Sequence, residues 1–178
     1  LNKMKKELFN IKNEKIFYIE GDYNYGRLNK ITNGWRSLES NYSINLGGAI
    51  HIIDLFSWFT KSNITSVIAT ANNIVTNKSN FKYNDFSSSL IKFKDGSIGK
   101  INANFGGVIP HNHFLRIFTN KRTIEYSFDK LFFYNSRNKN TKPKKYTQNT
   151  YKRDFVLNSF ILHLIKNSKP EVTPEDIF

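Results

Sequence analysis

The dipeptide Asp95-Gly96 restricts the fold of this chain more than any other feature of its sequence. An Asp-Gly pair between two strand-like segments is a strong signal for a tight hairpin turn, because glycine reaches the positive φ that such turns require. The segments on either side, residues 87–93 and 98–105, are rich in the residues that favour strands. This part of the chain is therefore predicted to form an antiparallel β-hairpin.

Further segments predict a mixture of strands and helices. Strands are expected at residues 16–23, 64–71, 114–119, 123–128 and 131–134. Helices are expected at residues 1–12, 47–59 and 154–166, and a fourth is expected to begin at Thr173-Pro174. This order predicts an α+β fold, in which an open, mostly antiparallel β-sheet carries its helices on one face.

Three of these regions carry specific expectations. The helix at residues 47–59 is apolar over most of its circumference, so it is expected to be largely buried. Residues 23–45 show little periodicity and are expected to form a long irregular loop, of a kind that often carries function. Residues 135–150 are rich in Asn, Lys and Thr, and they are expected to form a solvated loop.

The chain of 178 residues carries a net charge of +13, from 27 Lys and Arg against 14 Asp and Glu. Such an excess could bind nucleic acid, a membrane surface or an anionic substrate. Alternatively, it reflects a composition rich in Lys, Asn and Ile throughout the chain. The lysines are scattered and their one cluster, at residues 142–145, falls in a predicted loop, which favours the second interpretation.

Composition excludes several classes of protein. With 39% hydrophobic and 15% aromatic residues, the chain can bury a core, which excludes wholesale disorder. The absence of Cys excludes a disulfide scaffold, and no apolar run approaches the roughly 18 residues of a membrane span. The first residues lack the apolar core of a signal peptide, so a cytoplasmic location is expected. Because the chain does not begin with Met, we expect it to be part of a longer polypeptide.

His51 and Asp54 are the most informative polar residues, because they lie three apart in an apolar helix and so on one side of it. His51 could exchange a proton near neutral pH while Asp54 orients it. The alternative is a structural histidine bonded to a backbone carbonyl, with Asp54 paired to an arginine. The helix by itself favours this alternative. The sequence contains no GxGxxG, P-loop, zinc-binding or nucleophile-elbow motif.

A pair of histidines, His111 and His113, follows Gly106-Gly107 at a connection between predicted strands. They could form the polar rim of a pocket, or they could be ordinary loop histidines, which is the commoner case. Two histidines at this spacing without a nearby acid are weak evidence for a metal, so no metal site is expected.

The long loop contributes Arg27 and Arg36, which could each grip a carboxylate or phosphate group through two hydrogen bonds. The alternative is that they are surface arginines that stack on Tyr25 and Trp35. The sequence favours neither interpretation.

The chain resembles the C-terminal domain of the Gfo/Idh/MocA family of NAD(P)-dependent oxidoreductases. The resemblance depends on the helical Gly-Gly-x-x-His-x-x-Asp element at residues 47–54, with residues 19–23 before it and the Asp95-Gly96 hairpin after it. It implies that the sheet face mediates homo-oligomerisation and that the helix-bearing side meets a Rossmann domain across the active-site cleft. It also implies hydride transfer between NAD or NADP and a hydroxyl or keto carbon of a sugar, polyol or nucleotide sugar.

The resemblance also implies roles for individual residues. His51 matches the helix histidine that the family uses near the reacting hydroxyl, and Asp54 matches a downstream acid that binds substrate or fixes the helix. Many members carry an Asp four residues before this histidine, where Gly47 stands here, so a proton relay through that position is not expected. The family's catalytic lysine lies in the nucleotide-binding half. From position alone, we expect further pocket walls at Tyr25, Arg27, Trp35, Arg36, His111 and His113.

The resemblance implies that residues 1–12 are the connecting helix from a Rossmann domain and that residues 13–178 are a C-terminal substrate-binding and oligomerisation domain. Without the Rossmann domain, this chain is not expected to catalyse turnover of a substrate. Two other hypotheses remain open from the sequence. One is a basic stand-alone module that binds nucleic acid or another anionic polymer, although the aromatic residues lie mostly inside apolar strands rather than among Lys and Arg. The other is a catalytically dead oligomerisation scaffold with the same fold.

Overall fold

The computed structural model describes residues 2–147 and 154–168. The chain divides into two units, Leu1–Thr147 and Gln148–Phe178. The described part of the second unit contains the helix α4 (Asp154–Lys166), as predicted. The helix expected to begin at Thr173 lies outside the described residues. No helix in the described part of the chain is long and apolar enough to cross a membrane.

The described residues of the first unit, 2–147, contain three helices, two short helical turns and eight strands. In chain order they are α1 (Asn2–Phe9), β1 (Ile16–Asn24), α2 (Leu28–Thr32), the 3-10 turn η1 (Trp35–Ser37), the π-helical turn η2 (Asn45–Ala49), α3 (Ile50–Thr60), β2 (Ile64–Asn72), β3 (Phe86–Phe93), β4 (Ile98–Asn104), β5 (Asn112–Thr119), β6 (Thr123–Ser127), β7 (Lys130–Tyr134) and β8 (Lys144–Thr147).

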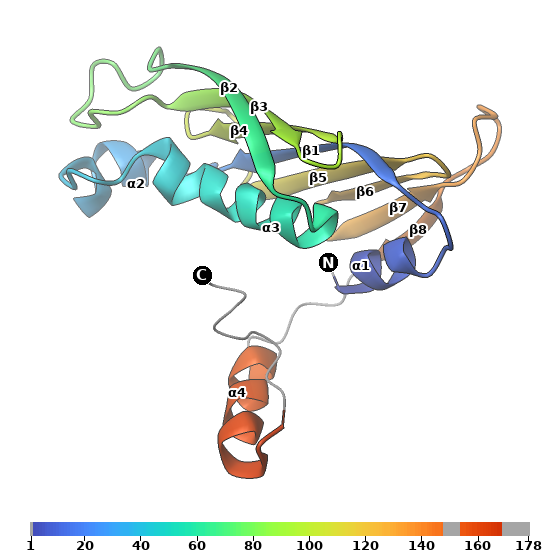
Figure 1. Cartoon of the computed structure of the whole chain (residues 1–178). Helices are drawn as coiled ribbons and strands as arrows, with labels where there is room; N and C mark the ends of the chain where they lie inside the picture. The colour runs from blue at the N-terminus through green and yellow to red at the C-terminus, as the bar shows by residue number, and fades with distance from the viewer. Residues whose placement is uncertain (1, 148–153, 169–178) are drawn as a thin grey trace. The chain divides into compact units, whose positions relative to one another are not determined.

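All eight strands form one sheet in the order β2-β3-β4-β1-β5-β6-β7-β8. Every neighbouring pair is antiparallel except β1 and β4, which run parallel. Figure 1 shows α2, α3 and α1 along one side of this sheet, which we call the covered face. The opposite side, which no helix of residues 2–147 covers, is the open face. The predicted α+β fold with an open, mostly antiparallel sheet is confirmed.

The hairpin at Asp95-Gly96 joins β3 to β4 as predicted. Gly96 has a φ of +90°, a conformation that glycine adopts without steric cost. The carboxylate of Asp95 accepts hydrogen bonds from the backbone N–H of Ser97 at 3.0 Å and from its hydroxyl at 2.7 Å. The turn residues therefore specify the connection through both backbone freedom and a side-chain bond.

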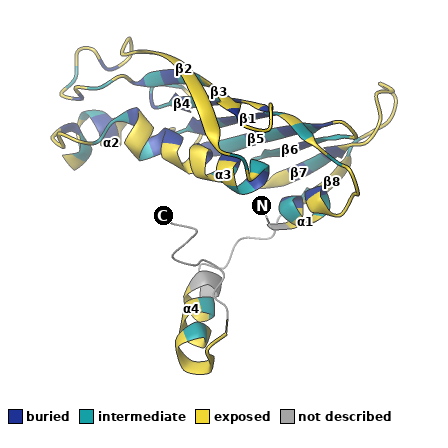
Figure 2. Cartoon of the chain, in the orientation of Figure 1, coloured by how far each residue is buried: buried dark blue, intermediate teal, exposed yellow. Residues whose placement is uncertain are grey.

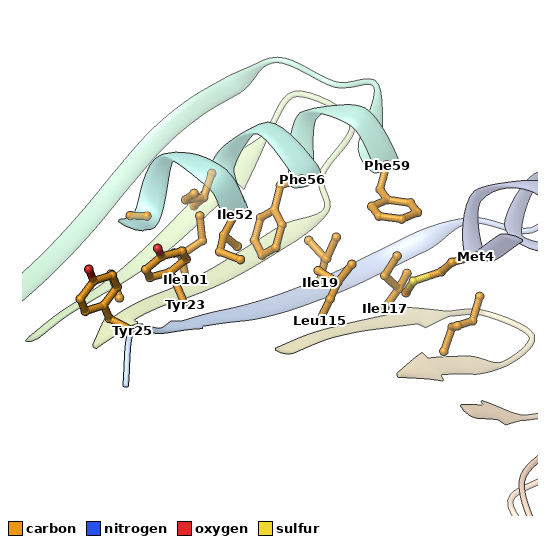
Figure 3. Close-up of a cluster of buried hydrophobic side chains, with 14 of the residues drawn as sticks. Met4, Ile19, Tyr23, Tyr25, Ile52, Phe56, Phe59, Ile101, Leu115 and Ile117 are labelled. Atoms are coloured by element: carbon orange, nitrogen blue, oxygen red, sulfur yellow. The ribbon is translucent and has the colours of Figure 1, made fainter. Parts of the chain in front are cut away.

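Helix α3 packs very closely on the middle of the covered face. Its buried side chains are Ile52, Phe56 and Phe59, which meet the apolar residues of β1, β4 and β5 in Figure 3. The close approach depends on two glycines in the sheet. A Cβ atom at Gly21 would lie 2.6 Å from the Ile52 side chain, and one at Gly99 would lie 2.9 Å from the Phe56 ring.

Helix α1 packs at the other end of the same face, where its Met4 side chain points toward Ile117 of β5 (Figure 3). The segment after α1 is held by an ion pair between Glu14 and Arg122, whose side chains are only 1% and 7% exposed. The Arg122 guanidinium donates to both carboxylate oxygens of Glu14 at 2.9 Å, and Thr119 donates to one of them at 2.7 Å. This bond network joins the N-terminal helix to the β5–β6 hairpin.

Three expectations were wrong in detail. Helix α3 is not largely buried, because Ile50 and Ile53 are 46% and 37% exposed. Figure 2 colours much of the outer side of this helix as exposed. The predicted irregular loop at 23–45 contains the end of β1, α2 and η1, and the predicted loop at 135–150 contains β8. Short elements of three to five residues are stabilised by tertiary contacts rather than by periodicity, so the sequence did not reveal them.

Candidate active site

Tyr23, near the end of β1, is the centre of a group of rings on the covered face. Its neighbours in the sheet are Ala103 of β4 and His113 of β5. The Tyr23 ring stacks with that of His113 at 4.9 Å and with that of His51 at 5.5 Å between centroids. The His111 ring meets Tyr23 edge-on at 5.7 Å. We call Tyr23, His51, His111 and His113 the histidine cluster.

The structure therefore brings His51 together with His111 and His113, which lie far from it in the sequence. His111 and His113 lie 5.2 Å apart between ring centroids, and Nδ1 of His111 donates to the Tyr25 carbonyl oxygen at 3.0 Å. Burial lowers the pKa of His113, and its two histidine neighbours lower it further, so its imidazole is neutral. Nε2 of His113 is buried without a hydrogen-bond partner among the described residues. No group of three or more His, Cys, Asp or Glu in the described residues could hold a metal ion.

His51 is exposed, so the expectation of a buried residue was wrong. The reason is helical geometry, because Ile52 and Phe56 point at the sheet and the adjacent residue is turned by about 100° from Ile52. The ring stacks on Tyr23, and the residue remains exposed. Asp54 is also exposed, and it forms no ion pair with any described residue, so the predicted structural pairing with an arginine is absent.

The long loop places its two arginines against aromatic rings, as the stacking interpretation predicted. The guanidinium carbon of Arg36 lies 4.5 Å from the Trp35 ring and 5.4 Å from the Tyr42 ring. That of Arg27 lies 6.0 Å from the ring of Tyr25, which is buried and adjoins Tyr23 at 6.4 Å. These contacts do not exclude a ligand, because stacking leaves the edge N–H groups of a guanidinium able to donate.

Tyr42 and Gly47 explain the departure from the family pattern at position 47. A Cβ atom at Gly47 would lie 2.7 Å from Cζ and 2.9 Å from the hydroxyl oxygen of Tyr42. The Tyr42 ring also stacks on Phe105 at 6.2 Å. The phenol of Tyr42 thus fills the space that an acidic side chain at position 47 would need.

Tyr23 and Tyr42 are site residues that the sequence interpretation did not assign. Burial raises the pKa of the Tyr23 phenol, and Tyr42 and Tyr25 raise it further, while Arg27 and Arg36 lower it. Figure 3 shows Tyr23 and Tyr25 side by side below the first turns of α3. The alternation of inward positions along β1, which also includes Ile19 and Gly21, could have revealed Tyr23.

A shallow hollow of about 430 Å³ lies along the loops next to these residues. Its lining is almost entirely backbone and aliphatic side chains: Gly26, Leu28, Gly106, Gly107, Val108, Ile109 and Pro110. The lining comes from the loop that precedes Arg27 and from the loop that leads into His111. The hollow therefore adjoins both the arginine-bearing loop and the histidine cluster.

The family described as the GFO/IDH/MocA C-terminal domain matches residues 12–125 of the sequence. The chain belongs to this family. Membership agrees with the open sheet, the covering helix α3 and the glycine-histidine element at its start. No curated protein matches the chain.

Solved structures with a similar fold include three dehydrogenases. UDP-N-acetylglucosamine 3-dehydrogenase GnnA from Acidithiobacillus ferrooxidans is 17% identical, with a TM-score of 0.69 over 95% of this chain and 51% of that one. The WlbA dehydrogenase from Bordetella pertussis, in complex with NADH and UDP-GlcNAcA, is 14% identical, with a TM-score of 0.65 over 98% and 51%. A levoglucosan dehydrogenase, in complex with NADH and levoglucosan, is 17% identical, with a TM-score of 0.65 over 83% and 42%. The chain thus spans about half the length of these proteins.

Proposed function

We propose that this chain is the substrate-binding and oligomerisation domain of an NAD(P)-dependent oxidoreductase. The proposed substrate is a sugar, polyol or nucleotide sugar, which reacts at a hydroxyl or keto carbon. The observation that carries the proposal is the exposed ring of His51, held on Tyr23 beside His113 on the covered face. Family membership supports the class of reaction, and the similar structures include dehydrogenases named for a UDP-sugar and for levoglucosan.

The chain's own residues hold the substrate and move one proton. His51 accepts the proton of the reacting hydroxyl during oxidation and returns it during reduction. Its stack on Tyr23 restricts the plane of the exposed ring. Asp54 lies three residues further along α3 on the same side and binds a second group of the substrate. Neutral His113 lies 6.4 Å from the His51 ring between centroids and forms the wall of the substrate site beside it.

The nicotinamide cofactor supplies the hydride acceptor or donor when it is bound. The sequence contains no glycine-rich turn that could hold the phosphates of a dinucleotide, so these residues do not fit a complete cofactor site. We assign the binding of NAD or NADP mainly to a Rossmann domain of the same polypeptide. Residues 1–12 then form the connection to it, and residues 13–178 form the C-terminal domain.

The open face of the sheet is the proposed homo-oligomer interface. Arg116 lies at its centre and pairs with Glu20 at 2.9 Å and Glu125 at 2.7 Å. Its guanidinium also lies 4.9 Å from the Phe114 ring and 6.0 Å from the Phe118 ring. Aromatic rings around an arginine that is already paired with carboxylates are typical of a surface that packs against a second subunit. Light scattering should show that Phe114→Asp lowers the oligomeric mass, whereas Ile11→Asp, in the loop after α1, should not.

Two observations test the enzymatic proposal. A GxGxxG strand–turn–helix should be encoded upstream of Leu1 in the natural gene, and its absence would contradict the proposal. The complete natural polypeptide should also oxidise members of a panel of sugars, polyols and nucleotide sugars, followed by nicotinamide absorbance. In that protein His51→Ala should lower turnover by about a hundredfold or more.

The matched control is Ser57→Ala, which changes an exposed residue on the same helix. It should leave turnover unchanged. Unchanged turnover in His51→Ala would remove the proton-transfer role from that residue and would favour a scaffold without its own chemistry.

A further inference from the structure

Arg27 and Arg36 of the long loop differ from Arg116 and Arg122 of the sheet in how their charge is satisfied. Arg116 and Arg122 each pair with two carboxylates. Arg27 and Arg36 pair with no carboxylate among the described residues, and they contact aromatic rings instead. A guanidinium that is held in place without an anion is available to bind one.

Arg36 is the more constrained of the two. Its Nε is buried and has no hydrogen-bond acceptor within residues 2–147 and 154–168. The rings of Trp35 and Tyr42 lie against its guanidinium carbon at 4.5 and 5.4 Å. The two rings restrict the orientation of the guanidinium plane, which a planar carboxylate or a phosphate can approach edge-on with two parallel hydrogen bonds.

A chain of contacts connects this group to the histidine cluster. Tyr42 packs against Gly47, which lies four residues, or about one turn, before His51. Arg27 lies over the ring of Tyr25, which adjoins Tyr23, the ring on which His51 stacks. Arg36 lies over the ring of Tyr42, which contacts Phe105, and Phe105 in turn contacts Tyr23. Contacting rings therefore join both cations to the proposed reaction centre.

We propose that Arg36 and Arg27 form an anion subsite, and that the substrate is a sugar derivative bearing a carboxylate or phosphate group. This inference rests on the proposed oxidoreductase function and narrows its substrate class. The group that reacts lies at His51, while the acidic group of the same molecule binds at the arginines. The subsite is a local feature, distinct from the scattered lysines that make up most of the net charge of +13.

Binding to the 178-residue chain tests the subsite without any turnover. The probes are matched pairs, glucose against glucuronate and glucose against glucose 6-phosphate, titrated while the imidazole signals of the histidine cluster are followed by NMR. One acidic member should bind about tenfold or more tightly than glucose, as expected for a charge-assisted bidentate contact. Carboxylate and phosphate are distinguished by which acidic probe shows the preference.

Variants assign the preference to residues. Arg36→Gln should remove most of the acidic preference and leave glucose binding within about twofold, whereas Arg36→Lys should retain part of it because the charge remains. Arg27→Gln should also reduce the preference for the acidic probe over glucose. Arg137→Gln, in the exposed loop between β7 and β8, is the charge-matched control and should change nothing.

Kinetics of the complete natural polypeptide separate this inference from the proposed function. Arg36→Gln should raise KM for the acidic substrate, with little change in kcat or in KM for the cofactor. Equal binding of acidic and neutral probes, or an effect on the cofactor alone, would overturn the subsite. An intact acidic preference without nicotinamide-dependent turnover would instead overturn the oxidoreductase proposal and leave the anion subsite standing.

Discussion

The close approach of α3 to the sheet gives the sharpest test of how the site is positioned. Gly21→Ala adds one methyl group beneath the helix, where the Cβ atom would lie 2.6 Å from Cγ2 of Ile52 and 3.1 Å from the Phe56 ring. Neither side chain is exposed to solvent, so neither can swing away. The helix must therefore shift outward, and His51 must shift with it.

The expected loss of stability follows from two opposing effects. Overpacking a well-filled core costs about 1–3 kcal/mol. Replacing glycine by alanine also restricts the unfolded chain, which contributes about 0.4–1 kcal/mol in the favourable direction. Because the predicted contact is far inside van der Waals distance, overpacking dominates, and we expect a net loss of about 1–2 kcal/mol.

Urea denaturation of the chain, followed by tryptophan fluorescence, measures this loss as a lower midpoint at unchanged slope. A second substitution identifies its cause. Ile52→Ala alone should cost about 2–5 kcal/mol, because it leaves a cavity. Together, the two substitutions should cost at least about 1 kcal/mol less than their sum, because the new methyl group occupies the vacated space. Additive losses, or a Gly21→Ala variant as stable as the parent, would refute the argument.

Other predictions concern buried charge and pH. Glu14→Gln should lower the free energy of unfolding by about 3 kcal/mol, because it leaves the Arg122 guanidinium buried against an uncharged group. Urea denaturation measures this loss, and a loss below about 1 kcal/mol would contradict the prediction. Burial lowers the pKa of His113, so the folded chain disfavours its protonated form. Its contribution to stability is therefore complete above about pH 6.5, and it is lost as the pH falls through the pKa of the folded state. His113→Gln should flatten that part of the pH profile, and an unchanged profile would exclude His113 as its source. Burial raises the pKa of Asp22, so its charged form is less stable in the folded chain than in the unfolded one. Asp22→Asn removes this charge and can still accept the hydrogen bond from Asn102, so it should stabilise the chain near neutral pH but not near pH 3. A loss of stability at neutral pH would argue against this reasoning.

Strands β1 to β7 were predictable because local sequence determines them. The turn at Asp95-Gly96 depends on one glycine and one carboxylate that are adjacent in the chain. The inward positions of β1 alternate with outward ones, so one face of the strand can be read directly from its residues. The strand β8 was missed, because four residues rich in Lys form a strand only where an existing edge, here β7, offers them backbone partners.

The sequence by itself indicated the candidate site residues: the histidines, the two loop arginines and the glycine-histidine element that resembles the family. Only the tertiary structure decided which of them meet. Tyr23, His51 and His113 converge because register places β5 beside β1 and because Gly21 and Gly99 admit α3 onto the sheet. Residues far apart in the chain become neighbours through packing, and packing depends on shapes summed over the whole core rather than on any local pattern.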